Sequence, residues 1–171
     1  MKKFITAVLS GIMCLSLCAC NVQETVSDIA EEVTSSDTSE KTYKVNESAK
    51  ADDVVVTMTD VYESEGEPYL EPEEGNVFVI CEFNIENNSD KEINISSMLN
   101  FDAYCDDYSC ELSISALSSN NDKQQLDGTI AAGKKFSGIV GYEVPAEWTN
   151  IEVRYAPDIL KDDKLIFVHE K

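Results

Sequence analysis

The sequence is poor in the side chains that most enzymes use. Its single histidine among 171 residues, His169, alternates with Phe167 and Leu165 and is predicted to end a strand. There is no glycine-rich phosphate loop, no Cys-x-x-Cys pair, no His-Glu-x-x-His and no Gly-x-Ser-x-Gly motif. These absences exclude the commonest routes to phosphoryl transfer, zinc-dependent hydrolysis and nucleophilic catalysis. We therefore predict that the protein is not an enzyme, and we expect no cofactor.

Positive charge is also scarce. Thirteen Lys and Arg residues stand against 33 Asp and Glu residues, so the formal net charge is −20. Nucleic-acid phosphates and anionic lipid headgroups would repel such a chain, because binding to either needs clusters of Lys and Arg. Nucleic-acid binding is therefore excluded. The partner that this charge favours is a cationic or basic component of the cell envelope.

Only one long apolar run is present, and it lies at the N-terminus. Two lysines precede the apolar segment 4–17, and Leu17-Cys18-Ala19-Cys20 closes it. The motif resembles a bacterial lipobox, so residues 1–19 are predicted to be a signal peptide and Cys20 the lipidated first residue of the mature chain. The alternatives are an ordinary signal peptide or an uncleaved anchor helix, although the run is short for a bilayer span. We expect a lipid anchor on the extracytoplasmic face of a bacterial membrane.

Residues 20–41 lack aromatic residues, proline and glycine and are rich in Ser, Thr, Asp and Glu. This composition predicts a solvated linker between the anchor and a folded domain. One pattern within it is left open, because four apolar residues would lie on one stripe of a short helix. These are Val22, Val26, Ile29 and Val33.

From residue 42 onward the apolar residues alternate with polar ones, which is typical of β-strands. The clearest example is Asn76–Asn87, where every second residue from Val77 to Ile85 is apolar. Other strands are predicted at 53–62, 91–95, 99–105, 110–115, 134–144, 150–155 and 164–168, and the polar segment 116–127 is predicted to be a long connection with a helical turn. Seven to nine strands within residues 42–171 fit one all-β, two-sheet sandwich.

Four segments carry a resemblance to a known family: Tyr43–Glu47, Val54–Thr57, Gly75–Lys91 and Ile130–Pro145. Their order and spacing resemble the bacterial lipoprotein domain known as domain of unknown function 4352. The resemblance implies an immunoglobulin-like β-sandwich, similar to the immunoprotective extracellular antigen fold, over residues 42 to about 156. It implies no catalytic or binding residues. Ala132 departs from the proline usual in the family, and the cysteine pair described next is not part of the pattern.

Three cysteines remain once the lipobox is set aside. The N-terminal segment holds Cys14, Cys18 and Cys20, and the β domain holds Cys81, Cys105 and Cys110. Cys105 and Cys110 flank a predicted hairpin turn and would face each other across it, which favours a disulfide. The alternative is two free thiols, because not every exporting bacterium oxidises its surface proteins. Cys81 lies on the apolar face of a strand and is predicted to be a small buried hydrophobe.

Acidic side chains suggest only weak metal candidates. Asp102, Asp106, Asp107 and Glu111 gather around the cysteine hairpin. Divalent cations prefer several oxygen ligands, but this spacing is not that of an EF-hand loop. We predict no metal site, with solvated acids as the default.

The segment 62–75 is the best candidate for an interaction surface. It carries six glutamates together with aromatic, apolar and proline residues, and the predicted contact residues are Tyr62, Glu63, Glu65, Tyr69, Leu70 and Glu71. Aromatic side chains provide contact area at low entropic cost, and the carboxylates would select a basic partner. The alternative is a solvated loop whose tyrosines pack locally.

Taken together, these patterns predict a monomeric envelope lipoprotein that displays a non-catalytic, immunoglobulin-like binding module. The main alternative is a structural or immunity-type envelope protein without a specific ligand. A calcium-dependent binding module and a carboxylate-dependent glycan hydrolase are the remaining alternatives, both based on the abundance of acids.

Overall fold

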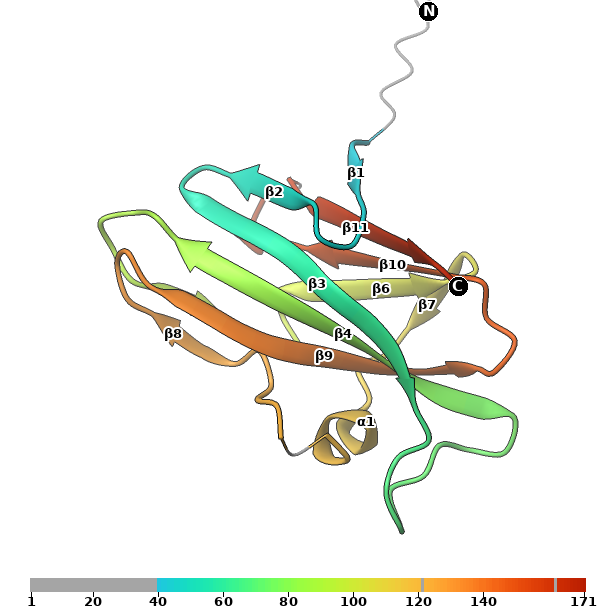
Figure 1. The fold of residues 1–171 in the computed structure, drawn as a ribbon. Helices are drawn as coiled ribbons and strands as arrows, with labels where there is room; N and C mark the ends of the chain where they lie inside the picture. The colour runs from blue at the N-terminus through green and yellow to red at the C-terminus, as the bar shows by residue number, and fades with distance from the viewer. Residues whose placement is uncertain (1–39, 121, 162) are drawn as a thin grey trace, which may run out of the picture. The chain divides into compact units, whose positions relative to one another are not determined.

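The computed structural model describes residues 40–120, 122–161 and 163–171 (Figure 1). The elements are β1 (Thr42–Tyr43), β2 (Ser48–Ala51), β3 (Val54–Ser64), β4 (Asn76–Asn87), β5 (Ile93–Ile95), β6 (Phe101–Cys105), β7 (Tyr108–Cys110), α1 (Ile114–Ser118), β8 (Gly128–Ile130), β9 (Lys135–Pro145), β10 (Asn150–Tyr155) and β11 (Leu165–Glu170). The predicted signal peptide, Cys20 and the apolar stripe of the linker lie outside the described residues.

Two sheets face each other across an apolar core. One has the strand order β1-β11-β10-β6-β7 and the other β2-β3-β4-β9, with β5 and β8 forming a separate short pair. Neighbouring strands are antiparallel, except that β1 runs parallel to β11. Phe83, Tyr142 and Phe167 are among the large side chains buried between the sheets. This architecture confirms the predicted all-β, immunoglobulin-like sandwich.

The first half of strand β4 is buried on both faces, at residues 78–81. Val79, Cys81 and Phe83 alternate into the core between the sheets, whereas Phe78 and Ile80 lie under α1 on the outer face. Antiparallel sheets more often leave one face in water. The alternation predicted for Asn76–Asn87 is confirmed, and the outer face is apolar because the helix covers it.

The predicted strand 110–115 is wrong beyond Cys110. The Ser113 hydroxyl accepts a hydrogen bond from the Ala116 N–H, so Ser113 caps a helix. The connection around this helix covers the free edge of β9, where the Ser113 N–H donates to the Gly141 carbonyl at 2.8 Å. Gly138 and Gly141 permit that approach, because a Cβ at either would lie 3.0 Å or less from this connection.

Within the described ranges, no helix is long and apolar enough to cross a membrane.

Candidate functional site

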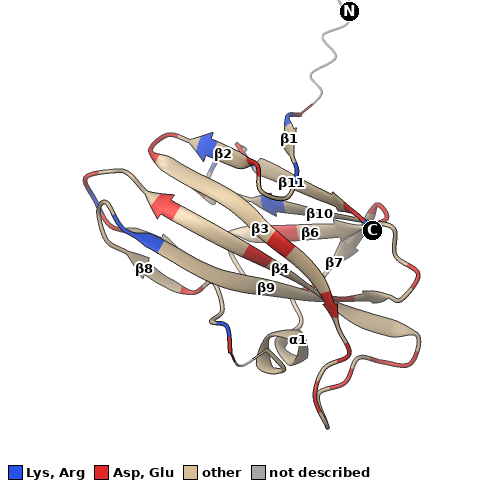
Figure 2. Ribbon diagram, in the orientation of Figure 1, with Lys and Arg blue, Asp and Glu red and all other residues tan. Residues whose placement is uncertain are grey.

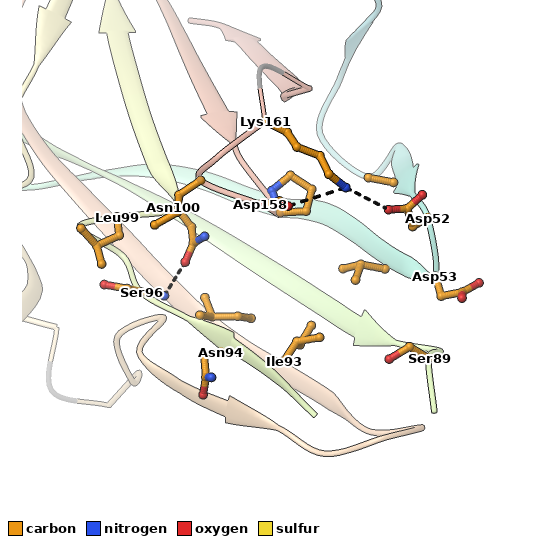
Figure 3. A pocket seen from close by; sticks show the side chains of 15 residues that line it. Asp52, Asp53, Ser89, Ile93, Asn94, Ser96, Leu99, Asn100, Asp158 and Lys161 are labelled. Carbon is orange, nitrogen blue, oxygen red and sulfur yellow. Dashed lines mark hydrogen bonds and ion pairs between the residues drawn. The ribbon is translucent and has the colours of Figure 1, made fainter. Parts of the chain in front are cut away.

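One end of the sandwich is hollowed into a cleft of about 540 Å³ (Figure 3). Four separate segments form its walls: the β2–β3 turn, the β4–β5 loop at Ser89, β5 with the connection that leads to β6, and the loop that follows β10. The lining residues are Ala51, Asp52, Asp53, Val54, Ser89, Ile93, Asn94, Ile95, Ser96, Leu99, Asn100, Pro157, Asp158, Ile159 and Lys161. We refer to this hollow as the cleft.

Asn100 holds two of these walls together. Its side-chain carbonyl accepts the Ser96 N–H at 2.8 Å, and its amide donates to the Ala156 carbonyl at 2.8 Å. The Ala156 N–H returns a hydrogen bond to the Asn100 carbonyl. Asn100 is only 8% exposed, so these bonds are made away from water, where losing a partner is costly. The cleft is therefore built on a fixed frame.

Apolar side chains form much of the cleft surface. Val54 and Ile95 are buried at its floor, whereas Leu99 is 64% exposed and Ile159 is 57% exposed at its rim. Their neighbours Met98 and Leu160 are also exposed. Large exposed apolar side chains concentrated on two adjoining segments are a common mark of a contact surface.

Acidic groups share the rim with these apolar side chains. Asp52, Asp53 and Asp158 line the cleft together with one cation, Lys161. Figure 3 shows Lys161 extending between Asp52 and Asp158, with its Nζ 4.0 Å from Asp52 Oδ2 and 3.6 Å from Asp158 Oδ2. Beyond Lys161 lies a second hollow of about 260 Å³, which shares Asp52 and Asp158 with the first.

The predicted interaction loop divides into a fixed base and an exposed tip. At the base, Tyr62 donates to Asn120 Oδ1 at 3.3 Å, and Glu63 accepts from Trp148 Nε1 at 2.7 Å and pairs with Lys171 Nζ at 2.6 Å. These hydrogen bonds to Lys171 and Trp148 hold the pKa of Glu63 below its usual value.

We call the connection from Ser64 to Gly75 the acidic hairpin. Figure 2 shows acidic segments and no basic one along it. At its tip Tyr69 is 98% exposed and has a φ of +74°, while Glu65 and Glu71 are also exposed and Leu70 is half-buried. Neither Tyr69 nor Glu71 lines any of the five main hollows in the described part of the chain.

Cys105 and Cys110 are not joined by a disulfide in the structure, which matches the free-thiol alternative, and the predicted bridge stays a prediction. Their hairpin has a two-residue turn of Asp106 and Asp107, both with positive φ, which matches a type I′ turn. The register then pairs Cys105 with Tyr108 and Cys110 with Ala103. The two cysteines therefore lie diagonally on the ladder and not directly opposite each other.

Burial governs the chemistry of these thiols. It raises the pKa of Cys105 to about 12, with further contributions from neighbouring Cys110 and Asp106, and it also raises the pKa of Cys110. Cys81 is fully buried, as predicted, and burial raises its pKa strongly. All three thiols are therefore protonated at neutral pH, which makes them poor nucleophiles and metal ligands.

The weak metal candidates have other roles. Asp106 accepts from the Thr149 hydroxyl at 2.6 Å and from the Asn150 N–H at 3.0 Å, and these bonds, the Thr149 hydroxyl first, lower its pKa. Asp102 pairs with Lys164 Nζ at 2.6 Å. Asp107 and Glu111 are exposed. In the described part of the chain, no three His, Cys, Asp or Glu side chains form a metal-binding group.

None of the residues that line the cleft was predicted from the sequence to be a site residue. Its acids lie in two separate places in the sequence, at 52–53 and 158, and much of its apolar surface comes from a third, at 93–100. The one available signal was the apolar pair Ile159-Leu160 in an otherwise polar loop, since such a pair is unusual on a solvated connection.

The fold and the cleft define the class as an immunoglobulin-like sandwich domain with a hollow at one end. Over residues 43–165 the sequence matches domain of unknown function 4352, and the chain belongs to that family. The resemblance noted in the sequence is thereby confirmed. No curated protein matches the chain.

Solved structures show the same fold. The Bacillus subtilis protein ycdA, described as a candidate lipoprotein, has a TM-score of 0.61 at 18% identity, covering 72% of this chain and 38% of ycdA. B. subtilis yjhA has a TM-score of 0.55 at 20% identity, covering 73% of this chain and 97% of yjhA. MPT63, a secreted Mycobacterium tuberculosis protein, has a TM-score of 0.53 at 13% identity, covering 77% of this chain and 97% of MPT63. The chain thus spans well under half of ycdA, and none of the three descriptions names a reaction.

Proposed function

We propose that this protein is a lipid-anchored protein of the bacterial envelope that binds a partner in the cleft and performs no catalysis. The observation that carries the proposal is the cleft itself, an apolar hollow of about 540 Å³ on a frame fixed by Asn100. Ligand sites are concave, largely preformed and lined by apolar groups with a few polar ones. The cleft has each of these properties.

The absence of catalysis is proposed from the chemistry of the cleft lining. The cleft contributes carboxylates, one ammonium, amides and hydroxyls, with no histidine or cysteine among its lining residues. A carboxylate-dependent glycan hydrolase would need an acid whose pKa is raised by burial. Of the cleft carboxylates, Asp52 and Asp53 are exposed and Asp158 is half-buried, so none is enclosed away from water. Binding is therefore the activity that this surface supports.

The location is proposed from the lipobox. Replacing Cys20 by Ser removes the sulfur that would carry the lipid, so we expect the protein to move from the membrane fraction to the soluble extracytoplasmic fraction. Cys18→Ser is the matched control and should leave the membrane fraction unchanged, because Cys18 lies before the predicted cleavage point. Equal membrane retention of both variants would contradict lipid anchoring at Cys20.

The cleft is tested with a fragment titration that assumes no partner chemistry beyond an apolar group. We use the mature chain with Cys20→Ser, labelled with ¹⁵N, and benzyl alcohol as the probe. The amides of residues 93–100 and 157–161 should shift in a saturable manner, and Leu99→Ser should weaken this response. Shifts spread evenly over the surface, or absent at these amides, would contradict the proposed site.

A further inference from the structure

We propose that the cleft takes a basic, amphipathic polypeptide segment, and that Lys161 occupies the position of the partner's cation in the free protein. The inference rests on the proposed function and adds the class of partner. It starts from the observation that apolar side chains and carboxylates lie next to each other on one concave surface. Apolar Leu99 and Ile159 stand at the same rim as Asp52 and Asp158. A segment with cationic and apolar side chains on neighbouring positions is complementary to both.

Lys161 is weakly held for an ion-paired lysine. Its contacts of 4.0 Å to Asp52 and 3.6 Å to Asp158 are the longest ion pairs in the described part of the chain. Lys164 and Lys171, in contrast, approach their carboxylates at 2.6 Å. Charge-assisted hydrogen bonds are normally about 2.7 to 2.9 Å long, and exposed ion pairs add little stability. An incoming ammonium or guanidinium group can therefore replace Lys161 at little cost.

Other occupants fit the cleft less well. The chain's own segment 21–39 contains five acidic and no basic residues, so the carboxylate rim repels it. A second copy carries the same net charge of −20 and is repelled in the same way. Anionic lipid headgroups need a cluster of basic residues, and the cleft lining offers only Lys161. Charge complementarity therefore selects a basic partner.

The test uses three synthetic heptapeptides with capped ends. The basic peptide is Lys-Leu-Lys-Phe-Lys-Leu-Lys, and Gln or Glu replaces each Lys in the neutral and acidic peptides. Affinities for the mature Cys20→Ser chain are measured by calorimetry at about 0.15 M salt, which screens long-range attraction. We expect the basic peptide to bind at least about tenfold more tightly than the neutral one, and the acidic peptide most weakly.

Two sets of variants should change the basic-peptide affinity in opposite directions. Lys161→Gln removes the internal cation and should tighten binding about threefold, whereas Lys161→Arg keeps it and should leave binding unchanged. Asp52→Asn with Asp158→Asn should weaken binding about tenfold. Asparagine at 158 keeps the oxygen that accepts the Leu160 N–H at 3.0 Å, so the loop is preserved.

Matched controls remove the same charges elsewhere. Lys44→Gln removes an exposed cation that lies beside His169 and Glu170, none of which lines the cleft, and Glu65→Gln with Glu71→Gln removes two exposed acids from the acidic hairpin. Neither should alter affinity by more than about twofold. The proposal is overturned if Lys161→Gln fails to tighten binding, if the hairpin variant weakens it as much as the cleft variant, or if the neutral peptide binds equally well.

The experiments also distinguish a failure of this inference from a failure of the proposed function. If benzyl alcohol still shifts the cleft amides while all three peptides bind alike, the cleft is a binding site whose partner is not basic. If benzyl alcohol and every peptide fail, the proposed function falls as well.

Discussion

The cleft and the acidic hairpin lie on the same sandwich and are both acidic, yet they differ in shape. The hairpin concentrates five glutamates within residues 64–75 and presents Tyr69 on a convex tip. The cleft has three aspartates from distant parts of the chain, arranged around an apolar hollow. Carboxylates on a convex surface stay solvated, and an ion pair with one partner there contributes little free energy. Acids that lie beside a preformed apolar surface therefore indicate a binding site better than a larger number of acids on a convex surface.

The largest expected effect comes from the frame of the cleft. Asn100→Ala leaves the Ser96 N–H and the Ala156 carbonyl without their buried partner. We expect the free energy of unfolding to fall by about 2 to 3 kcal/mol, measured by urea denaturation, with loss of benzyl alcohol binding. Asn94→Ala is the control, because exposed Asn94 also lines the cleft but makes one exposed bond, to Thr129. A similar loss of stability in both variants would contradict the role of Asn100.

The second prediction compares one exposed apolar side chain from each region. Leu99→Ser removes apolar surface from the cleft rim and should weaken binding of the basic and neutral heptapeptides about five- to tenfold alike. Tyr69→Ser removes a larger and more exposed side chain from the acidic hairpin, and should leave both affinities unchanged. If Tyr69→Ser has the larger effect, the hairpin and not the cleft is the interaction surface.

The third prediction concerns pH at the base of the hairpin. The pKa of Glu63 is lowered in the folded state from its ordinary value of 4.5, so the unfolded chain binds its proton first as pH falls. The bonds of Glu63 therefore stabilise the fold above about pH 4.5, and this contribution is lost as pH falls through the lower folded pKa. The difference in melting temperature between the parent and Glu63→Gln should shrink as pH falls from 7 to about 2.5.

Glu65→Gln is the control for this pH series, since it removes an equal charge from the exposed part of the hairpin. If its melting difference follows the same pH curve as that of Glu63→Gln, the specific bonds to Trp148 and Lys171 are not the cause.

The smallest effect is expected at the hairpin tip. Tyr69 has a φ of +74°, a conformation that costs energy for most side chains and that asparagine tolerates. Tyr69→Asn should therefore raise the free energy of unfolding by about 0.5 kcal/mol. Tyr108→Asn changes a similarly exposed tyrosine that does not have positive φ, and should give no gain. Equal changes in the two variants would remove backbone conformation as the explanation.

Much of the fold could be predicted from local patterns. Strands β4 and β10 begin and end where predicted, because sustained alternation of apolar residues fixes both the element and its buried face. Strand β8 was missed because Gly128-Thr129-Ile130 is too short to alternate. The segment after Cys110 was mispredicted because Ser113, a good helix cap, was counted as part of a strand.

The candidate site could not be predicted in the same way. The acidic hairpin stands out in the sequence because its acids are adjacent, whereas the cleft brings together residues more than a hundred positions apart, such as Asp52 and Lys161. These residues come close only because the sheet that contains β2 and β3 packs against the sheet that contains β10 and β11. The cysteine pair illustrates the same limit, because the number of residues in its turn decides whether Cys105 faces Cys110 or Tyr108.

The most direct test of the central claim is an amide NMR titration of the ¹⁵N-labelled mature chain, carrying Cys20→Ser, with the basic heptapeptide. We expect saturable shifts concentrated at residues 52–53, 93–100 and 157–161, with the amides of the acidic hairpin unchanged. Shifts concentrated at residues 64–75, with the cleft amides unmoved, would contradict it and assign the interaction to the hairpin.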